Sequence, residues 1–154
     1  MGSYKDLLLY KKSFSLAMEI YAITKQFPKE ETYSLTDQIR RSSRSVNICT
    51  IEAYRKRRFP NHFVSKLTDV DMENSETQGW LEFSLACNYI TKDTYDNLFS
   101  QSDEIGRIAQ YMINNPGKFG AGENTNKWYK YFAAKHYQQA SNCKLLTENC
   151  QLWK

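Results

Sequence analysis

The sequence predicts an all-α protein, an up-down-up-down antiparallel four-helix bundle over residues 1–116 with a C-terminal appendage over residues 117–154. Apolar residues recur at three- and four-residue steps through four long segments, as in amphipathic helices. Only 3 prolines and 6 glycines interrupt the 154 residues, too few for a turn-rich β-sandwich. The connections between the four segments are short, which favours antiparallel neighbours.

The first helix is expected between about Lys5 and Gln26. Phe27-Pro28 should end it, because the residue before a proline is pushed out of the α region. Its apolar stripe should contain Leu7, Phe14, Met18 and Tyr21, widened by Leu8, Ala17 and Ile20.

The second helix is expected to begin near Ser34, the predicted N-cap, and to reach about Arg57. Asp37 can act there like a capping-box acid. Phe59 and Pro60 should break the helix, and the proline also suits the first turn of the next one. The buried face of the second helix should include Ile39, Val46, Cys49 or Thr50, and Ala53.

The third and fourth helices are expected over about residues 61–88 and 92–114. Thr91 should cap the fourth, and Asn115-Pro116-Gly117 should stop it. The buried stripe of the fourth should be Tyr95, Leu98, Ser102, Ile105, Ala109 and Met112. The third has a coiled-coil-like seam with polar residues in its middle. That seam is Phe63, Leu67, Val70, Asn74, Thr77, Leu81 and Leu85.

The appendage has two predicted parts. Residues 117–126 have the composition of a linker. Residues 127–139 should form one short helix that displays aromatic and basic side chains.

Residues 38–59 combine an apolar stripe with a concentration of positive charge. Seven cations stand there against a single acid, Glu52. The following stretch, residues 69–104, holds nine acids against Lys92 alone. The seven cations, called the basic block below, are Arg40, Arg41, Arg44, Arg55, Lys56, Arg57 and Arg58.

Two interpretations of the basic block remain open. In the first, it binds the phosphates of RNA or another nucleic acid, because clustered cations release condensed counterions. Arg40 and Arg44 share a helix face at i and i+4, and the cations of residues 55–58 complement the helix dipole. In the second, the acidic third helix neutralises the block and the oligomer is a protein-binding scaffold.

Arg40, Glu52 and Glu76 form a second candidate set, because all three lie close to predicted apolar stripes. A carboxylate in such a place is paired or has a raised pKa. We expect structural ion pairs among these residues. The other interpretation is a carboxylate pair that performs acid–base chemistry.

Other chemistry has little support in the sequence. It has no phosphate-cradling glycine loop, nucleophile elbow or zinc signature, so we expect no enzyme, cofactor, metal or small-molecule substrate. His62 and His136 have no spaced ligand partners. The four cysteines, without an export signal, predict free thiols in the cytoplasm. No apolar stretch is long enough to span a membrane.

Apolar residues beyond one stripe predict a second buried face and therefore a homo-oligomer. Aromatic residues such as Trp80, Trp128 and Trp153, with the eleven tyrosines, suit either stacking on bases or filling cores and interfaces. The surplus apolar residues are Leu9, Tyr10 and Ile23 on the first helix and Val64, Trp80 and Phe83 on the third.

Several motifs occur in an order that resembles one bacterial family. They are Phe27-Pro28-Lys29-Glu30-Glu31, Leu35-Thr36-x-Gln38-Ile39-Arg40-Arg41, Glu52-Ala53-Tyr54 and Ser75-Glu76-Thr77-Gln78. The family is that of four-helix bundle proteins encoded in intervening sequences of 23S ribosomal RNA genes, and the resemblance covers roughly residues 4–114. Where the family usually has Asn-Ile-Ala-Glu, this chain has Cys49-Thr50-Ile51-Glu52 and shares only the glutamate.

The resemblance implies a homopentamer with nucleic-acid association. A more distant resemblance is to the basic accessory protein of diversity-generating retroelements, which is a pentameric barrel. This analogy favours RNA binding at the level of the fold.

Overall fold

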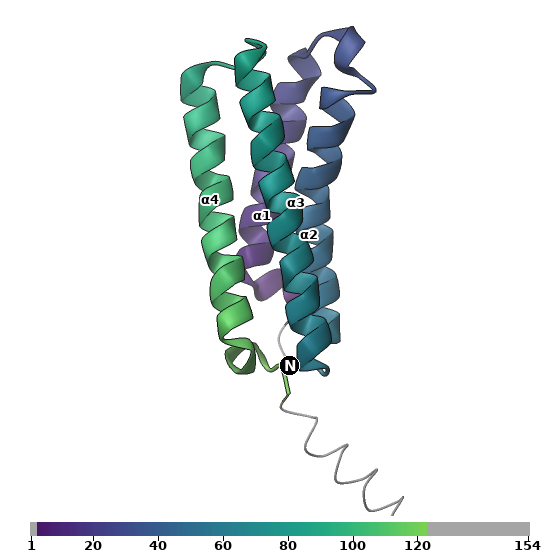
Figure 1. Ribbon diagram of the computed structural model, residues 1–154, viewed down its shortest axis with the longest axis vertical. Coiled ribbons are helices and arrows are strands. Elements are labelled where there is room, and N and C mark those ends of the chain that lie inside the picture. The colour runs from purple at the N-terminus through teal and green to yellow at the C-terminus, as the bar shows by residue number, and fades with distance from the viewer. Residues whose placement is uncertain (1–2, 123–154) are drawn as a thin grey trace, which may run out of the picture.

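Four long helices stand side by side in the computed structural model, which describes residues 3–122 (Figure 1). Successive helices run in opposite directions, so the predicted four-helix bundle is confirmed, and the described residues contain no strand. The helices are α1 (Leu8–Ile23), α2 (Leu35–Lys56), α3 (Pro60–Ala86) and α4 (Lys92–Asn114). Short 3₁₀ turns occupy Tyr4–Asp6, Thr24–Gln26, Lys29–Glu31 and Pro116–Phe119.

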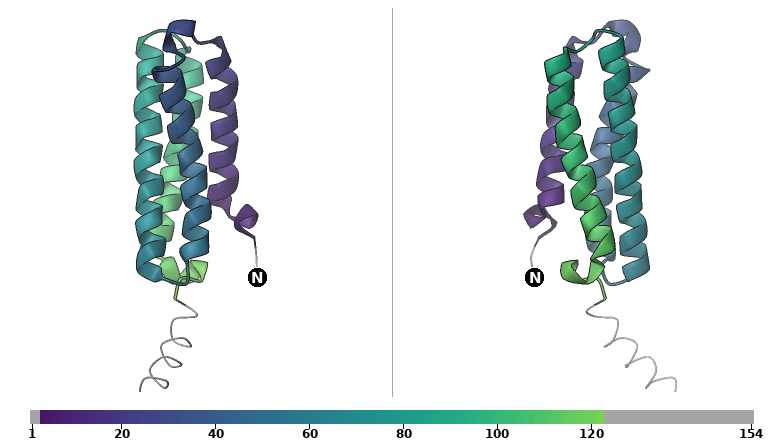
Figure 2. Two further views of the ribbon diagram at one scale, coloured as in Figure 1. Left: turned by 90° about the vertical axis from the view of Figure 1, so that its right-hand side faces the viewer. Right: turned by 60° about the vertical axis from the view of Figure 1, so that its left-hand side comes forward.

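Each helix packs against the helices before and after it, and α1 also packs against α4 to close the bundle (Figure 2). The order around the bundle is therefore α1, α2, α3, α4. This arrangement follows from the short connections, which leave each helix beside its predecessor.

The core forms where the sequence predicted it on α2, α3 and α4. On α3, the seam from Phe63 to Leu81 is buried, with Ser84 in place of Leu85 at its end. On α4, Leu98 to Met112 are buried and Tyr95 packs at the edge of the core. On α2, Thr50 is buried and Cys49 is only half-buried.

The predicted stripe of α1 is correct for Ala17 and Ile20, which are buried, and wrong for Leu8, Phe14 and Met18. Phe14 and Met18 are 51% and 48% exposed, and Leu8 is exposed as well. The core side of α1 consists of Leu9, Ser13, Leu16, Ala17 and Ile20. Both stripes have helical spacing, and the polar Ser13 in the middle of the buried one conceals it in the sequence.

The expected surplus of apolar residues is also distributed differently. Leu9 belongs to the core, and Ile23, Val64 and Trp80 pack partly against it. Phe83 is exposed, as predicted for a residue outside the core stripe.

Of the three helix starts predicted from a cap or a proline, two are confirmed. Pro60 is the first residue of α3, and Thr91 caps α4 by accepting the backbone N–H of Thr94 at 3.2 Å. Ser34 precedes α2 but does not cap it with its side chain. Instead, the Glu31 carboxylate accepts the backbone N–H of Leu35 at 3.2 Å and the Ser34 hydroxyl.

Glu31 also ties the connection to the end of α3, because it accepts the Tyr89 hydroxyl at 3.1 Å. These hydrogen bonds, led by the one from Ser34, lower the pKa of Glu31. The hydrogen bond from Tyr89 to Glu31 also raises the pKa of Tyr89.

Polar side chains inside the bundle link successive helices. The Asn47 amide of α2 donates to the Ser13 hydroxyl and to the Tyr10 carbonyl of α1, both at 2.9 Å. The Thr77 hydroxyl of α3 lies 2.9 Å from that of Ser42 on α2.

Between α3 and α4 the bond is reciprocal. Asn74 donates to the Ser102 carbonyl at 3.0 Å and accepts the Ser102 hydroxyl at 2.9 Å. Because the members of these three pairs are hydrogen-bonded, they are tolerated in the core.

The packed unit extends past the predicted boundary at residue 116. Phe119 packs against the core, Ala121 is buried, and the Gly122 N–H donates to the Arg57 carbonyl at 3.2 Å. The rest of the predicted linker and the short helix expected over residues 127–139 lie outside the described residues. Within the described part, no helix is long and apolar enough to cross a membrane.

Candidate nucleic-acid interface

The basic block has three members in the N-terminal half of α2 and four at its C-terminal end and just beyond it. Helical geometry distributes its members over different sides of the helix, because positions three or four apart share a side. Arg40, Arg44 and Arg55 lie toward α1, Arg41 lies toward α3, and the remaining three lie at the C-terminal end of the helix.

Arg40 and Arg44 gather around one tyrosine of α1. Their guanidinium carbons lie 5.1 and 5.6 Å from the centre of the Tyr21 ring, within the range of a cation–π interaction. The Arg40 Nε also donates to the Thr24 hydroxyl at 2.7 Å. Arg40 is therefore held in place, while the Arg44 side chain is exposed.

Arg55 faces the N-terminal turn that precedes α1. Its guanidinium carbon lies 6.0 Å from the centre of the Tyr4 ring. Tyr4 in turn packs edge-on against Tyr10 at 5.1 Å and Tyr54 at 6.3 Å. Aromatic rings thus line the junction between α1 and α2 next to these arginines.

The end of α2 carries a compact group of cations. The Arg57 guanidinium stacks on the Tyr54 ring at 3.8 Å and donates to the Tyr54 carbonyl at 2.6 Å. Arg55, Lys56 and Arg58 are exposed. Cations at this end are favoured by the helix dipole, so their concentration there costs the helix little.

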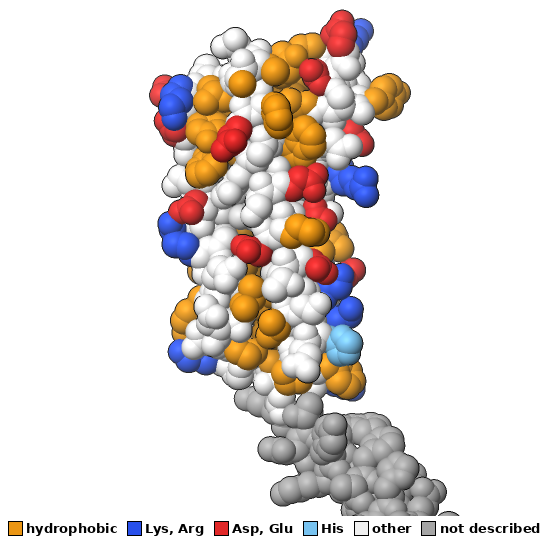
Figure 3. All heavy atoms as spheres, in the orientation of Figure 1, with side chains coloured by type: hydrophobic (Ala, Val, Ile, Leu, Met, Phe, Trp, Pro, Cys, Tyr) orange, Lys and Arg blue, Asp and Glu red, His pale blue; other side chains and the backbone are white. Residues whose placement is uncertain are grey.

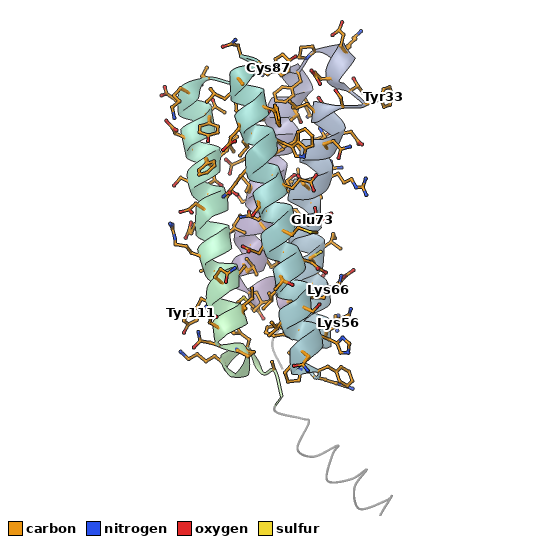
Figure 4. The ribbon with its side chains drawn as sticks, in the orientation of Figure 1. Tyr33, Lys56, Lys66, Glu73, Cys87 and Tyr111 are labelled. Atoms are coloured by element: carbon orange, nitrogen blue, oxygen red, sulfur yellow. The ribbon has the colours of Figure 1, made fainter. Side chains whose placement is uncertain are left out.

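A lysine of α3 pairs with one carboxylate of α2 and one of α3. The Lys66 ammonium lies 2.8 Å from Glu52 and 2.9 Å from Asp69. These hydrogen bonds, first to Glu52 and then to Asp69, raise the pKa of Lys66. Figure 4 shows Lys56 and Lys66 near the lower end of the bundle, with Glu73 farther along α3.

None of the seven cations in the basic block forms an ion pair with a carboxylate of residues 3–122. The acidic residues of α3 and α4 are instead spread over the face seen in Figure 3. Arg41 forms no ion pair either, but its positive charge lowers the pKa of Glu73 and so partly offsets the effect of burial.

The second candidate set is not assembled. Arg40 contacts Thr24 and Tyr21, Glu52 pairs with Lys66, and Glu76 accepts the Trp80 indole N–H at 3.0 Å. The expected partners are therefore replaced by others. The reason is distance along the helix, because twelve residues separate Arg40 from Glu52, a rise of about 18 Å.

Glu73 is the carboxyl that has the raised pKa expected of such a site. Partial burial is the main cause, and the neighbouring Glu76 adds to it, while Arg41 acts in the opposite direction. Other reactive groups stand apart: His62 packs edge-on against Phe59, and burial raises the pKa of the half-buried Cys49 thiol. No group of acidic, His or Cys residues in the described range could hold a metal ion.

Sequence reasoning missed Tyr21, Tyr4 and Lys66 as neighbours of the charged groups. A signal was present for Tyr21. Phe14, Met18 and Tyr21 have helical spacing, which predicts that they share one side of α1. The sequence predicts that this side packs in the core, but Phe14 and Met18 are exposed and Tyr21 lies beside Arg40.

Residues 5–111 match the sequence profile of a family described as 23S rRNA-intervening sequence protein. A solved structure of a protein with unknown function from the S23 ribosomal protein family of Bacteroides thetaiotaomicron is similar. It has 28% sequence identity and a TM-score of 0.64, and the alignment covers 69% of this chain and 98% of that one. No curated protein matches the chain.

Proposed function

We propose that the chain, which belongs to the 23S rRNA-intervening sequence protein family, binds RNA or another nucleic acid through the basic block of α2. In this proposal it is a homo-oligomer without enzymatic activity, and it uses no cofactor. The residues that contact phosphate are Arg40, Arg41, Arg44, Arg55, Lys56, Arg57 and Arg58.

One observation carries the proposal. The cations of the basic block lack ion pairs within residues 3–122, while Lys66 of α3 pairs with Glu52 of α2 and with Asp69 of its own helix. An acidic helix stands beside α2, yet its charges are not used to neutralise the block. Clustered cations without carboxylate partners are suited to phosphates, because each phosphate contact releases a condensed counterion.

The proposed contacts predict little preference for base sequence. Guanidinium and ammonium groups on phosphates fix position, whereas sequence is distinguished by contacts with base edges. The logarithm of the binding constant should fall linearly with the logarithm of salt concentration, with a slope of about 0.7 to 0.9 per phosphate contacted.

The test is a quadruple variant in which Arg55, Lys56, Arg57 and Arg58 are changed to Ser. It should bind every RNA sequence more weakly and flatten the salt slope by roughly three to four units. A matched control changes four cations that contact α4 or its 3₁₀ extension, with the same loss of net charge. These are Lys12, Lys92, Arg107 and Lys118.

The control variant should retain most of the affinity and the slope of the natural protein. Both variants should keep their mass in light scattering and a cooperative thermal transition. Unchanged RNA affinity in a folded quadruple variant would contradict the proposal. Loss of the oligomer or of cooperative melting in the quadruple variant alone would instead assign these cations a structural role.

The second candidate function is a protein-binding scaffold whose basic block is neutralised by the acidic third helix. The influence of Arg41 on the pKa of Glu73 favours it, because this pair brings α2 and α3 charges together. Capture from native lysate with and without nuclease separates the two functions. Partners that disappear after nuclease treatment support nucleic-acid binding, and partners that persist support the scaffold.

The proposed assembly is a homo-oligomer, and the family resemblance favours five copies. Support comes from large apolar side chains that α3 leaves in solvent, Met72 and Phe83, both 59% exposed. Burial of such side chains between subunits is favourable. Light scattering at micromolar concentrations should give a multiple of 18.1 kDa, and a monomer mass throughout would refute the assembly.

A further inference from the structure

Two rows of side chains run next to each other along α1 and α2. The aromatic row on α1 consists of Tyr10, Phe14 and Tyr21, with Met18 between them. The arginine row on α2 consists of Arg40, Arg44 and Arg55, with Ile48 and Ile51 between them. With the residues between them counted, both rows follow three- and four-residue steps, and so each lies on one side of its helix.

The rows meet along the junction of the two helices. Arg40 and Arg44 lie over the Tyr21 ring at one end, and Arg55 faces Tyr4, which packs on Tyr10, at the other. Positive charge therefore stands at both ends of a strip whose middle is apolar.

The middle of this strip is open to solvent. Phe14, Met18 and Ile48 are 51%, 48% and 52% exposed. The Phe14 ring stacks on the Tyr10 ring with an interplanar angle of 21° and 6.1 Å between ring centres. Phe14 is consequently supported from within the protein while a large part of its surface remains accessible.

The acidic residues of the same two helices point elsewhere. Glu19 accepts the Gln101 amide of α4, and Glu52 pairs with Lys66 of α3. This leaves Asp37 in the first turn of α2 as the remaining acid on α1 or α2. The strip therefore has a strongly positive balance, which complements an anionic ligand.

From this geometry we infer that the strip between α1 and α2 binds single-stranded nucleic acid, with phosphates on the arginine row and bases stacked on Phe14 and Tyr10. The inference rests on the proposed function and specifies its ligand. Aromatic side chains between cations are the pattern used for single strands, because every base offers a π-face for stacking. A duplex keeps its bases paired and would gain only the phosphate contacts.

The test measures fluorescence anisotropy of labelled oligouridine, oligothymidine and an RNA duplex of mixed sequence at one salt concentration. The full chain should bind the single strands more tightly than the duplex. Phe14→Ala should weaken single-strand binding by about tenfold, the loss typical of one stacked base, and leave duplex binding unchanged. Phe14→Trp should retain single-strand affinity, because indole also stacks.

Tyr111→Ala is the matched control, since Tyr111 is an aromatic residue that is 49% exposed and lies on α4, not on α1 or α2. It should bind both ligands as the natural protein does. Equal affinities for single strand and duplex, with no effect of Phe14→Ala, would overturn the inference and leave phosphate binding by the basic block standing. Absence of binding to either nucleic acid would overturn both.

A second copy of this chain is the competing occupant of the strip, because the acidic surface of α3 and α4 also complements it. In that case Phe14→Ala would reduce the oligomeric mass in light scattering, while Tyr111→Ala would not, and the inference would be wrong. An unchanged mass together with the loss of single-strand binding supports it.

Discussion

The outer surface of α1 and α2 differs from that of α3 and α4 in charge, although the same kind of packing builds both halves. α2 carries five cations and two acids, whereas α3 carries one cation and five acids. Both halves nevertheless bury a stripe with helical spacing and link their two helices by a buried asparagine. The difference shows that the buried stripes determine the bundle, and that the charges outside them are available for other uses.

The two buried asparagines differ in whether their partners have other hydrogen bonds. Asn74 exchanges two hydrogen bonds with Ser102, so each residue satisfies the other. Asn47 donates to Ser13 and to the Tyr10 carbonyl, but the Ser13 hydroxyl also donates to that carbonyl at 3.2 Å.

The largest expected effect is therefore on the α3–α4 side. Asn74→Ala should lower the free energy of unfolding by about 2–3 kcal/mol, because it leaves a buried hydroxyl without an acceptor and creates a small cavity. Asn47→Ala should cost about 1 kcal/mol, because the partners that it leaves still bond each other. Urea denaturation of the two variants measures both values, and equal losses would show that the two halves rely equally on their asparagines.

A smaller effect is expected where the halves meet. Lys66→Met should lower the free energy of unfolding at neutral pH by up to about 1 kcal/mol, because Glu52 and Asp69 lose their shared cation. Methionine keeps a similar helix propensity and an apolar stem. Lys92→Met, which breaks an exposed pair with Asp96, is the control and should cost about 0.3 kcal/mol.

The pH dependence of the Lys66 effect has a defined sign. The raised pKa of Lys66 in the folded state means that its contribution is complete below the ordinary value of 10.5 and is lost as pH rises through the folded value. The deficit of Lys66→Met in chemical denaturation should therefore shrink above about pH 10.5. A deficit that persists unchanged there would indicate that the variant loses packing and not charge.

The smallest effect should have the opposite sign. Glu73 has a raised pKa in the folded state, so its ionised form is disfavoured there, and Glu73→Gln should stabilise the protein slightly at pH 7. The gain should vanish below about pH 4.5, where Glu73 is protonated in both states. Glu82→Gln, at an exposed position of the same helix, controls for the loss of one negative charge in paired thermal melts.

The sequence alone predicts α3 and α4 because each has a single apolar stripe with helical spacing. The residues that start these helices, Pro60 and Thr91, are also recognisable from the sequence next to them. Phe63 to Leu81 and Leu98 to Met112 are buried as predicted, with Asn74 and Ser102 included in the expected stripes. On α1, two stripes compete, and only the packing of α2 and α4 against it decides between them. Phe14 was assigned to the core for this reason and is exposed.

The sequence predicts which charged residues make up the candidate site, but not which side chains of the neighbouring helices lie next to them. The spacing of Arg40 and Arg44 predicts a shared helix face, and they share the Tyr21 ring. Which neighbouring helix lies beside that face depends on the order of the bundle. The pairing of Glu52 with Lys66 likewise depends on the position of α3 along α2, which local spacing does not give.

The hydrogen bonds inside the core also restrict how the helices can slide along one another. Leucine, isoleucine and valine stripes pack almost equally well after a shift of one turn, about 5.4 Å. The pairs Ser13–Asn47, Ser42–Thr77 and Asn74–Ser102 cross the three interfaces between successive helices. A shift at any of these interfaces would separate a pair and bury its polar groups without partners, so shifted alignments that the apolar residues would accept are excluded.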